Sequence, residues 1–187
     1  MLEVKPIGYV YHGYTDEQVR RAGAVEAFVE VDEEYAEALG GIDGFSHLIL
    51  VTFMHKAQRL PLRTKPVRIF RDVVQRLGVS DESMPEVGVF AVASPFRPNP
   101  IALTTVHLLK RSGRVLFVAG CDCFSGTPVL DIKPLTSYRF IDPDDYRVPD
   151  WQARLDEVFE ILRKHHPHRH RWDKPSFSIS VKRDENA

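Results

Sequence analysis

The most distinctive polar residues of this chain stand in a proline-rich stretch at residues 94–100, Ser-Pro-Phe-Arg-Pro-Asn-Pro, between two apolar runs. Its three prolines fix φ, remove backbone donors and hold each preceding residue extended, which excludes a helix or a central strand. A stiff loop of this kind presents its side chains in defined positions. Arg97 would offer a charge and Asn99 both donors and acceptors. The stretch therefore predicts a ligand-gripping loop, with a plain connection between strands as the alternative.

A second stretch with chemical potential is SGTPVLDIKP at residues 125–134. Gly126 would allow a ligand to approach the backbone closely. Asp131 and Lys133 share one face of an extended chain, so they would pair with each other or with a common ligand. His55 ends an apolar run, where it could bind a ligand, move a proton, or serve as a hydrogen-bonded structural residue.

Two further clusters have both a chemical and a plain interpretation. Residues 163–172, RKHHPHRHRW, contain no acid and could contact RNA phosphates while Trp172 stacks on a base, or could form a solvated basic segment. Cys121 and Cys123 share one face of a strand, and no ligands at zinc spacing stand nearby. We expect two core thiols and no metal. The sequence shows no Ser-His-Asp order, no carboxylate pair and no HExxH motif, so nothing in it favours a hydrolase or a metalloprotease.

The elements that position these residues are predicted to be mostly strands, because apolar residues alternate or run continuously in short segments. Strands are expected at residues 6–12, 24–32, 45–55, 87–93, 101–109, 114–122, 129–132 and 176–181. Helices are expected at residues 33–39, 63–78 and 151–162. No strand–helix–strand rhythm, GxGxxG motif or P-loop is present. The sequence predicts a mainly β protein, a single small antiparallel β-barrel with a few short helices.

Length and composition set broad limits. The 187 residues, 43% of them hydrophobic, suit one domain with a real core. We expect the barrel at residues 1–140 and a helical, basic C-terminal extension at residues 141–187. The net charge of −1 neither favours nor disfavours nucleic acid. No apolar run of membrane-spanning length and no signal-peptide pattern are seen, so no membrane association and a cytoplasmic location are expected.

Four separated motifs occur in one order along the chain: IDGFSHL at residues 42–48, the strand end FMH at 53–55, VGVFAVASPFRPNPIAL at 87–103 and SGTPVLDIKP at 125–134. Together they resemble the TsaA-like (TrmO-like) family of S-adenosylmethionine-dependent tRNA methyltransferases. The resemblance implies a small antiparallel barrel that works as a homodimer. It also implies methyl transfer to N6 of threonylcarbamoyladenosine, the modified base beside a tRNA anticodon.

The resemblance also implies site residues. The positions that match the family's S-adenosylmethionine contacts are His12, Gly13, Tyr14, His55, Lys56, Ala93, Leu103, Ser125, Gly126, Thr127 and Pro128, to which the proline-rich loop adds Arg97 and Asn99. Because methyl transfer to an amine requires removal of a proton, His55 and Asp131 are the candidate catalytic bases. The expected RNA contacts are Lys133, Arg163, Lys164, Arg169, Arg171 and Trp172.

The chain departs from the family pattern at the site itself. Val92-Ala93 replaces the usual Thr-Arg, Ser125 the usual Asp, and His12-Gly13 the usual Ser-Pro. Arg97 or Lys56 could supply the charge missing at Ala93. These changes leave two alternatives to the tRNA methyltransferase: a regulatory barrel that binds S-adenosylmethionine or RNA without catalysis, and a methyltransferase with a small-molecule acceptor.

Overall fold

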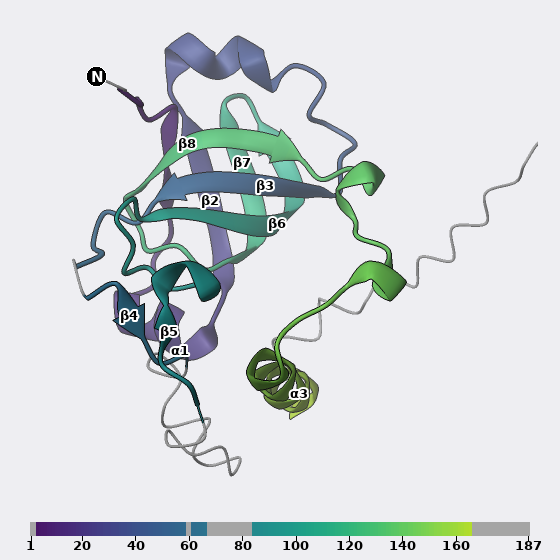
Figure 1. Ribbon diagram of the computed structural model, residues 1–187. Coiled ribbons are helices and arrows are strands. Elements are labelled where there is room, and N and C mark those ends of the chain that lie inside the picture. The colour runs from purple at the N-terminus through teal and green to yellow at the C-terminus, as the bar shows by residue number, and fades with distance from the viewer. Residues whose placement is uncertain (1–2, 59–60, 67–83, 166–187) are drawn as a thin grey trace, which may run out of the picture. The chain divides into compact units, whose positions relative to one another are not determined.

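The main structural element of this chain is a closed antiparallel barrel (Figure 1). The computed structural model describes residues 3–58, 61–66 and 84–165, with side chains of the last range described through residue 157. Six strands close the barrel in the order β1, β2, β7, β6, β3, β8, and each neighbouring pair is antiparallel. The predicted mainly β class and antiparallel barrel are thus confirmed.

The barrel strands are β1 (Gly8–Tyr11), β2 (Val25–Val31), β3 (His47–Phe53), β6 (Ile101–Ser112), β7 (Val115–Cys121) and β8 (Thr127–Pro134). The short strands β4 (Arg63–Thr64) and β5 (Val87–Gly88) form a separate pair. The helices are α1 (Asp16–Ala22), η1 (Glu33–Leu39), η3 (Val89–Ala91), η4 (Ser137–Arg139), η5 (Pro143–Asp145) and α3 (Asp150–His165).

The apolar positions of the strands fill the barrel core, as their two-residue period predicts. The fully buried side chains include Val10, Val29, Val31, Leu48, Leu50, Val106, Leu116, Val118 and Val129. Phe28, the one apolar residue that breaks the alternation of β2, faces outward. Its ring lies between Tyr11 and Phe117, at centroid distances of 5.6 and 6.4 Å. Cross-strand aromatic pairs of this kind stabilise a sheet from its outer face.

Several local predictions differ from the structure. The helix α1 was not predicted, although Thr15 and Gln18 form a capping box at its start. The strand expected at 87–93 ends after Gly88, because β5 pairs only with the two-residue β4 and the chain then enters η3. Arg63 and Thr64 are extended rather than helical. The rest of that predicted helix, from residue 67, and the strand expected at 176–181 lie outside the described residues.

The chain divides into two compact units, residues 1–64 with 87–145 and residues 65–86 with 146–187. The first unit contains the barrel. The second contains α3, which confirms the helix predicted at residues 151–162. The boundary expected between residues 140 and 141 stays a prediction.

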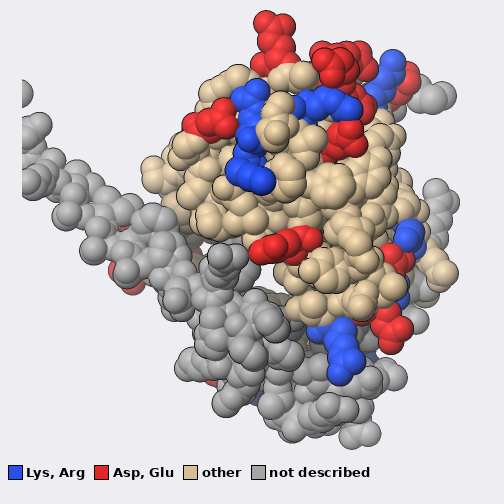
Figure 2. Space-filling view, turned by 180° about the vertical axis from the view of Figure 1, so that it is seen from behind, with Lys and Arg blue, Asp and Glu red and all other residues tan. Residues whose placement is uncertain are grey.

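Charged side chains of both signs are interspersed on the barrel surface shown in Figure 2, and no broad positive field is visible there. Ion pairs account for part of this mixing. Arg111 pairs with Asp43, and Arg114 pairs with both Glu30 and Glu33. Exposed pairs of this kind contribute little to stability, so the fold depends mainly on the apolar core and the closed hydrogen-bond ladder.

The close approach of β1 to β2 depends on Gly8. A Cβ atom at this position would lie 2.8 Å from the Val31 Cα and would also collide with the Glu30 carbonyl. We expect Gly8→Ala to lower the free energy of unfolding by roughly 2–3 kcal/mol, as overpacking does. Urea unfolding measures this loss. Gly88→Ala is the control, because nothing lies within 4 Å of its added Cβ and its φ is negative. Equal stability of the two variants would contradict the prediction.

Candidate functional site

One end of the barrel is polar inside. Thr52, Thr104 and Thr127 are buried there, where β3 ends and where β6 and β8 begin. Because neighbouring strands are antiparallel, β1 and β7 also end at this rim. The rim therefore brings together the four connections that follow or precede these strands, and we call it the polar rim. It receives residues 12–14, 54–56, 94–100 and 122–126, which include most of the predicted site.

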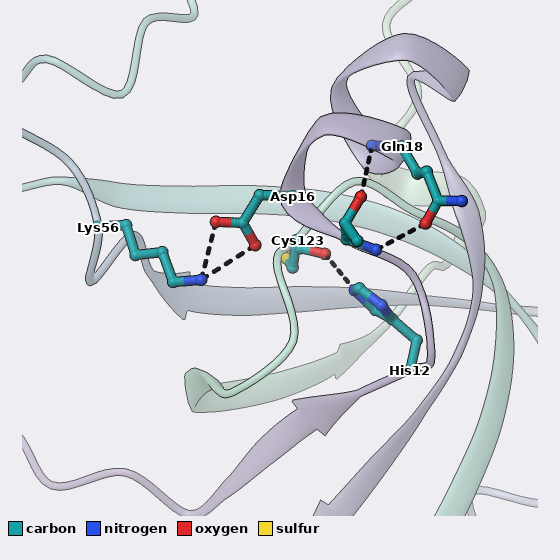
Figure 3. Close-up of polar contacts among 6 residues, drawn as sticks. His12, Asp16, Gln18, Lys56 and Cys123 are labelled. Carbon is teal, nitrogen blue, oxygen red and sulfur yellow. Dashed lines mark hydrogen bonds and ion pairs between the residues drawn. The ribbon is translucent and has the colours of Figure 1, made fainter.

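His12 joins the end of β1 to the connection between β7 and β8 (Figure 3). Its backbone N–H donates to Ser125 Oγ at 3.3 Å, and its ring Nε2 lies 3.0 Å from the carbonyl oxygen of Cys123. Its other ring nitrogen, Nδ1, accepts the backbone N–H of Tyr14 at 3.2 Å. The predicted cofactor residues of β1 and of the β7–β8 turn are thus in direct contact.

The helix α1 contacts the same rim through Asp16 and Arg20, two charged side chains that were not among the predicted site residues. Lys56 Nζ lies 2.8 Å from Asp16 Oδ2. Figure 3 shows the two side chains facing each other. Lys56 and Arg20 also lie against the Phe124 ring, 5.4 and 4.9 Å from its centroid. Such cation–π contacts are favourable even at exposed sites. Lys56, considered as a replacement for the missing arginine, therefore already has a carboxylate partner.

The β7–β8 turn adopts a backbone conformation that requires glycine. Gly126 has a φ of +82°, and its N–H donates to the Val10 carbonyl at 2.7 Å. No heavy atom lies within 4 Å of a Cβ built at Gly126, nor of one built at Gly13. Both glycines therefore leave room for a ligand to approach the backbone, as predicted for Gly126.

The proline-rich loop is fixed to the end of β3 by the hydrogen bond from the Met54 N–H to the Pro100 carbonyl, at 2.7 Å. Arg97 Nη1 donates to the Val92 carbonyl at 2.6 Å, and its guanidinium lies 5.7 Å from the Phe90 ring centroid. Arg97 thus uses part of its donor set to hold the loop. Asn99 is exposed, and its backbone carbonyl accepts the N–H of Ile101 at 2.8 Å.

Ala93 and Leu103 differ from the other predicted cofactor residues in their position. Ala93 is exposed on the approach to the loop. Leu103 is 72% exposed on the outer face of β6, opposite Val51 of β3. The structure therefore places them beside the polar rim rather than in the cluster around His12.

The two candidate bases are not brought together. His55 is exposed in the turn after β3, whereas Asp131 lies on β8 opposite Val51. His55 thus follows the end of β3, whereas the residue that Asp131 faces lies within that strand, four positions earlier in the chain. Asp131 forms an ion pair with Lys133, the first of the two outcomes that their spacing allowed.

Although His55 is mostly exposed, partial desolvation of its ring lowers its pKa, the neighbouring Lys56 charge lowers it further, and Asp16 opposes this in part. The imidazole is therefore neutral, and able to accept a proton, at neutral pH. The assignment of His55 and Asp131 as bases stays a prediction.

Asp122 is a rim residue that the sequence analysis missed. It is exposed, and its Oδ1 accepts the hydroxyl of the buried Thr104 at 2.7 Å. Its only sequence signal was its place between the two cysteines. Cys121 and Cys123 are free and buried, as expected for core thiols. Hydrogen bonding to Cys123 and burial raise the pKa of the Cys121 thiol, so this sulfur is a poor nucleophile.

The predicted RNA contacts are only partly within the described residues. Lys133 is half-exposed beside Asp131. Arg163 and Lys164 belong to the end of α3, and Arg169, Arg171 and Trp172 lie outside the described residues. In the described part of the chain, no three potential ligands among His, Cys, Asp and Glu form a metal site. None of its helices has the length and apolar character needed to cross a membrane.

The fold and its rim define the chain as a small antiparallel β-barrel whose polar end gathers glycine-containing loops. Residues 12–140 match the tRNA-methyltransferase O N-terminal domain family, and the chain belongs to this family. It is 34% identical over 139 residues to a probable S-adenosyl-L-methionine-binding protein of Pyrococcus abyssi, covering 72% of this chain and 68% of that one.

Two further comparisons extend the family. A human tRNA (adenine(37)-N6)-methyltransferase is 36% identical over 99 residues, which are 52% of this chain but only 20% of the human protein. A crystal structure of TrmO superposes with a TM-score of 0.57 at 25% identity, covering 87% of this chain and 76% of that one. The family named from the sequence motifs is therefore confirmed.

The lowered pKa of His55 has a measurable consequence. We expect its imidazole to titrate in the folded protein with a midpoint below 6.5, and near 6.5 in the urea-unfolded chain. The unfolded state then binds more protons as the pH falls below 6.5, so His55 makes a small contribution to the loss of stability in that range. NMR titration of the ring protons measures both midpoints. A folded midpoint above 6.5 would contradict the assignment.

Proposed function

We propose that this chain is an S-adenosylmethionine-dependent methyltransferase that acts on N6 of threonylcarbamoyladenosine beside a tRNA anticodon. The observation that carries the proposal is the convergence of residues 12–14, 55–56 and 125–128 at one polar rim, because the family resemblance assigns these segments to the cofactor. Two relatives support it by name, one as an S-adenosyl-L-methionine-binding protein and one as a tRNA methyltransferase. A tRNA substrate also favours a cytoplasmic location.

The residues at the rim suit such a cofactor. Gly13 and Gly126 leave open backbone, and the exposed ring of Tyr14 offers a surface on which a base could stack. The carboxylate of Asp122, held by Thr104, offers negative charge at the rim. S-adenosylmethionine, when bound, supplies an electrophilic methyl group on a positively charged sulfur.

The chain's own contribution is therefore mainly positional. The β7–β8 turn and residues 12–14 would hold the cofactor so that the acceptor nitrogen aligns with the methyl group. The neutral imidazole of His55 would accept the proton that the acceptor amine releases.

A second candidate function is a barrel that binds S-adenosylmethionine without catalysis. It is favoured by Ala93 at the usual arginine position and by the engagement of both possible replacements, since Lys56 pairs with Asp16 and Arg97 holds its own loop. Methyl transfer to a small molecule is the remaining alternative.

One set of assays can test both methyl transfer and the role of the β7–β8 turn in cofactor binding. Purified protein, labelled S-adenosylmethionine and tRNA that carries threonylcarbamoyladenosine should yield labelled tRNA. Gly126→Ala should weaken cofactor binding about tenfold or more, because a strained left-handed residue costs of order 1–3 kcal/mol and displaces the turn. Calorimetry measures the affinity.

A matched control for this variant is Gly113→Ala. Gly113 also has a positive φ, +58°, and open space around its Cβ position, but it belongs to the β6–β7 hairpin at the opposite end of the barrel. It should lose similar stability and keep cofactor affinity. Binding without transfer to tRNA would favour the non-catalytic barrel or a small-molecule acceptor. The absence of cofactor binding by the wild-type chain would refute the proposal.

We also propose that the chain forms a homodimer through the outer face of β3 and β6 near the polar rim. Leu103 is 72% exposed there, on the same strand face as Ile101, and the exposed Phe53 and Ile101 pair across the two strands. A contiguous exposed apolar patch on a barrel of this size is typical of a protein interface. Homodimers are also what the family resemblance implies.

The double variant Phe53→Ser/Ile101→Ser should shift the chain from dimer to monomer in analytical ultracentrifugation. The variant Phe28→Ser on the opposite outer face of the barrel is the control and should stay dimeric. A monomeric wild-type chain at concentrations near 100 μM would contradict the proposed interface, since stable interfaces normally form well below this range.

A further inference from the structure

His12 makes two long-range hydrogen-bonding contacts at the polar rim. It lies 111 residues from Cys123 and 113 from Ser125, yet contacts both. The position follows β1, where the family pattern has Ser-Pro rather than His-Gly. A serine side chain could not span the same two partners as an imidazole, whose nitrogens stand on opposite sides of a rigid ring.

The two ring contacts define the tautomer of His12. Nδ1 accepts the N–H of Tyr14, so it cannot itself carry a proton. The proton of the neutral ring therefore resides on Nε2, which donates it to the carbonyl oxygen of Cys123. In this state each ring nitrogen has a partner of the correct polarity, and the ring orientation is determined.

The carbonyl that His12 holds belongs to the turn that contains Gly126, whose φ is positive. Beyond Cys123, the turn is anchored by the N–H of Gly126 on Val10 and by the N–H of Thr127 on Phe124. Phe124 itself is covered by Arg20 and Lys56. His12, just after β1, therefore holds the start of the turn at Cys123. Arg20 of α1 and Lys56, just after β3, contact the next residue, Phe124.

We propose that His12, as the Nε2–H tautomer, is a positioning residue that holds the β7–β8 turn in its ligand-binding conformation. This role rests on the proposed function only in that the ligand of the turn is S-adenosylmethionine. The family pattern has a proline in the segment after β1, which would make this segment stiff. Here His12 instead fixes the segment by a long-range hydrogen bond to the β7–β8 turn. Cofactor affinity, rather than the methyl-transfer step, should depend on it.

Two substitutions separate the two ring contacts. His12→Gln places an amide N–H near the position of Nε2, so it can still donate to Cys123 but loses the Tyr14 contact. His12→Asn places an oxygen near the position of Nδ1, so it can still accept from Tyr14 but cannot reach Cys123. His107→Gln and His107→Asn, on the outer face of β6, are matched controls.

The first readout needs no cofactor. We expect the amides of Gly126 and Thr127 to exchange with solvent about fivefold faster in His12→Asn and His12→Ala, as expected for loss of one net hydrogen bond. His12→Gln and both His107 variants should keep wild-type exchange. Long-range proton–nitrogen NMR spectra of the wild-type ring should show the Nε2–H tautomer. The opposite tautomer, or equal exchange in the Asn and Gln variants, would overturn the proposal.

The second readout links the turn to function. The dissociation constant and KM for S-adenosylmethionine should rise about fivefold in His12→Asn, with kcat within twofold of wild type, and both His107 variants should keep wild-type values. A fall in kcat with unchanged KM would overturn the positioning role. If wild-type protein binds no S-adenosylmethionine, the proposed function fails, while the exchange experiment still decides the role of His12.

Discussion

The closure of the barrel by β1 is the constraint on which the rest of the structure depends. This four-residue strand pairs with β2 on one side and with β8, the last barrel strand of the chain, on the other, and so closes the barrel. Gly8 permits the close approach to β2 that this closure needs. Because closure removes free strand edges and fixes which strands are neighbours, it also fixes which strand ends meet at each rim.

The polar rim is the direct result of that arrangement. Antiparallel pairing brings the ends of β1, β3 and β7 beside the beginnings of β6 and β8. Among the described residues, all the buried threonines of the core lie at this end of the barrel. Burying a hydroxyl group is tolerated when it is hydrogen-bonded, as Thr104 is to Asp122. The stable apolar part of the core thus supports a rim at which polar groups and open glycine backbone can meet a ligand.

Charge at the rim is largely committed to internal contacts. Lys56 pairs with Asp16, and Arg97 donates to the backbone of its own loop. Neither side chain is simply a substitute for the arginine that the family usually has at the position of Ala93. The rim therefore relies on backbone, hydroxyl groups, aromatic rings and the Asp122 carboxylate, which suits a cofactor that carries its own positive charge and reactivity.

Much of this protein follows from the sequence alone, because strand alternation, proline stiffness and glycine turns are local properties. They predict the barrel class, the loop at 94–100 and the open backbone at Gly126, and the motifs identify the family. Local patterns did not predict that β5 would end after two residues, since strand length depends on a partner strand. The separation of His55 from Asp131, the pairing of Lys56 with Asp16 and the contact of His12 with Cys123 were decided only by tertiary structure. Each depends on strand order and register across more than 30 residues of chain, which no local pattern encodes.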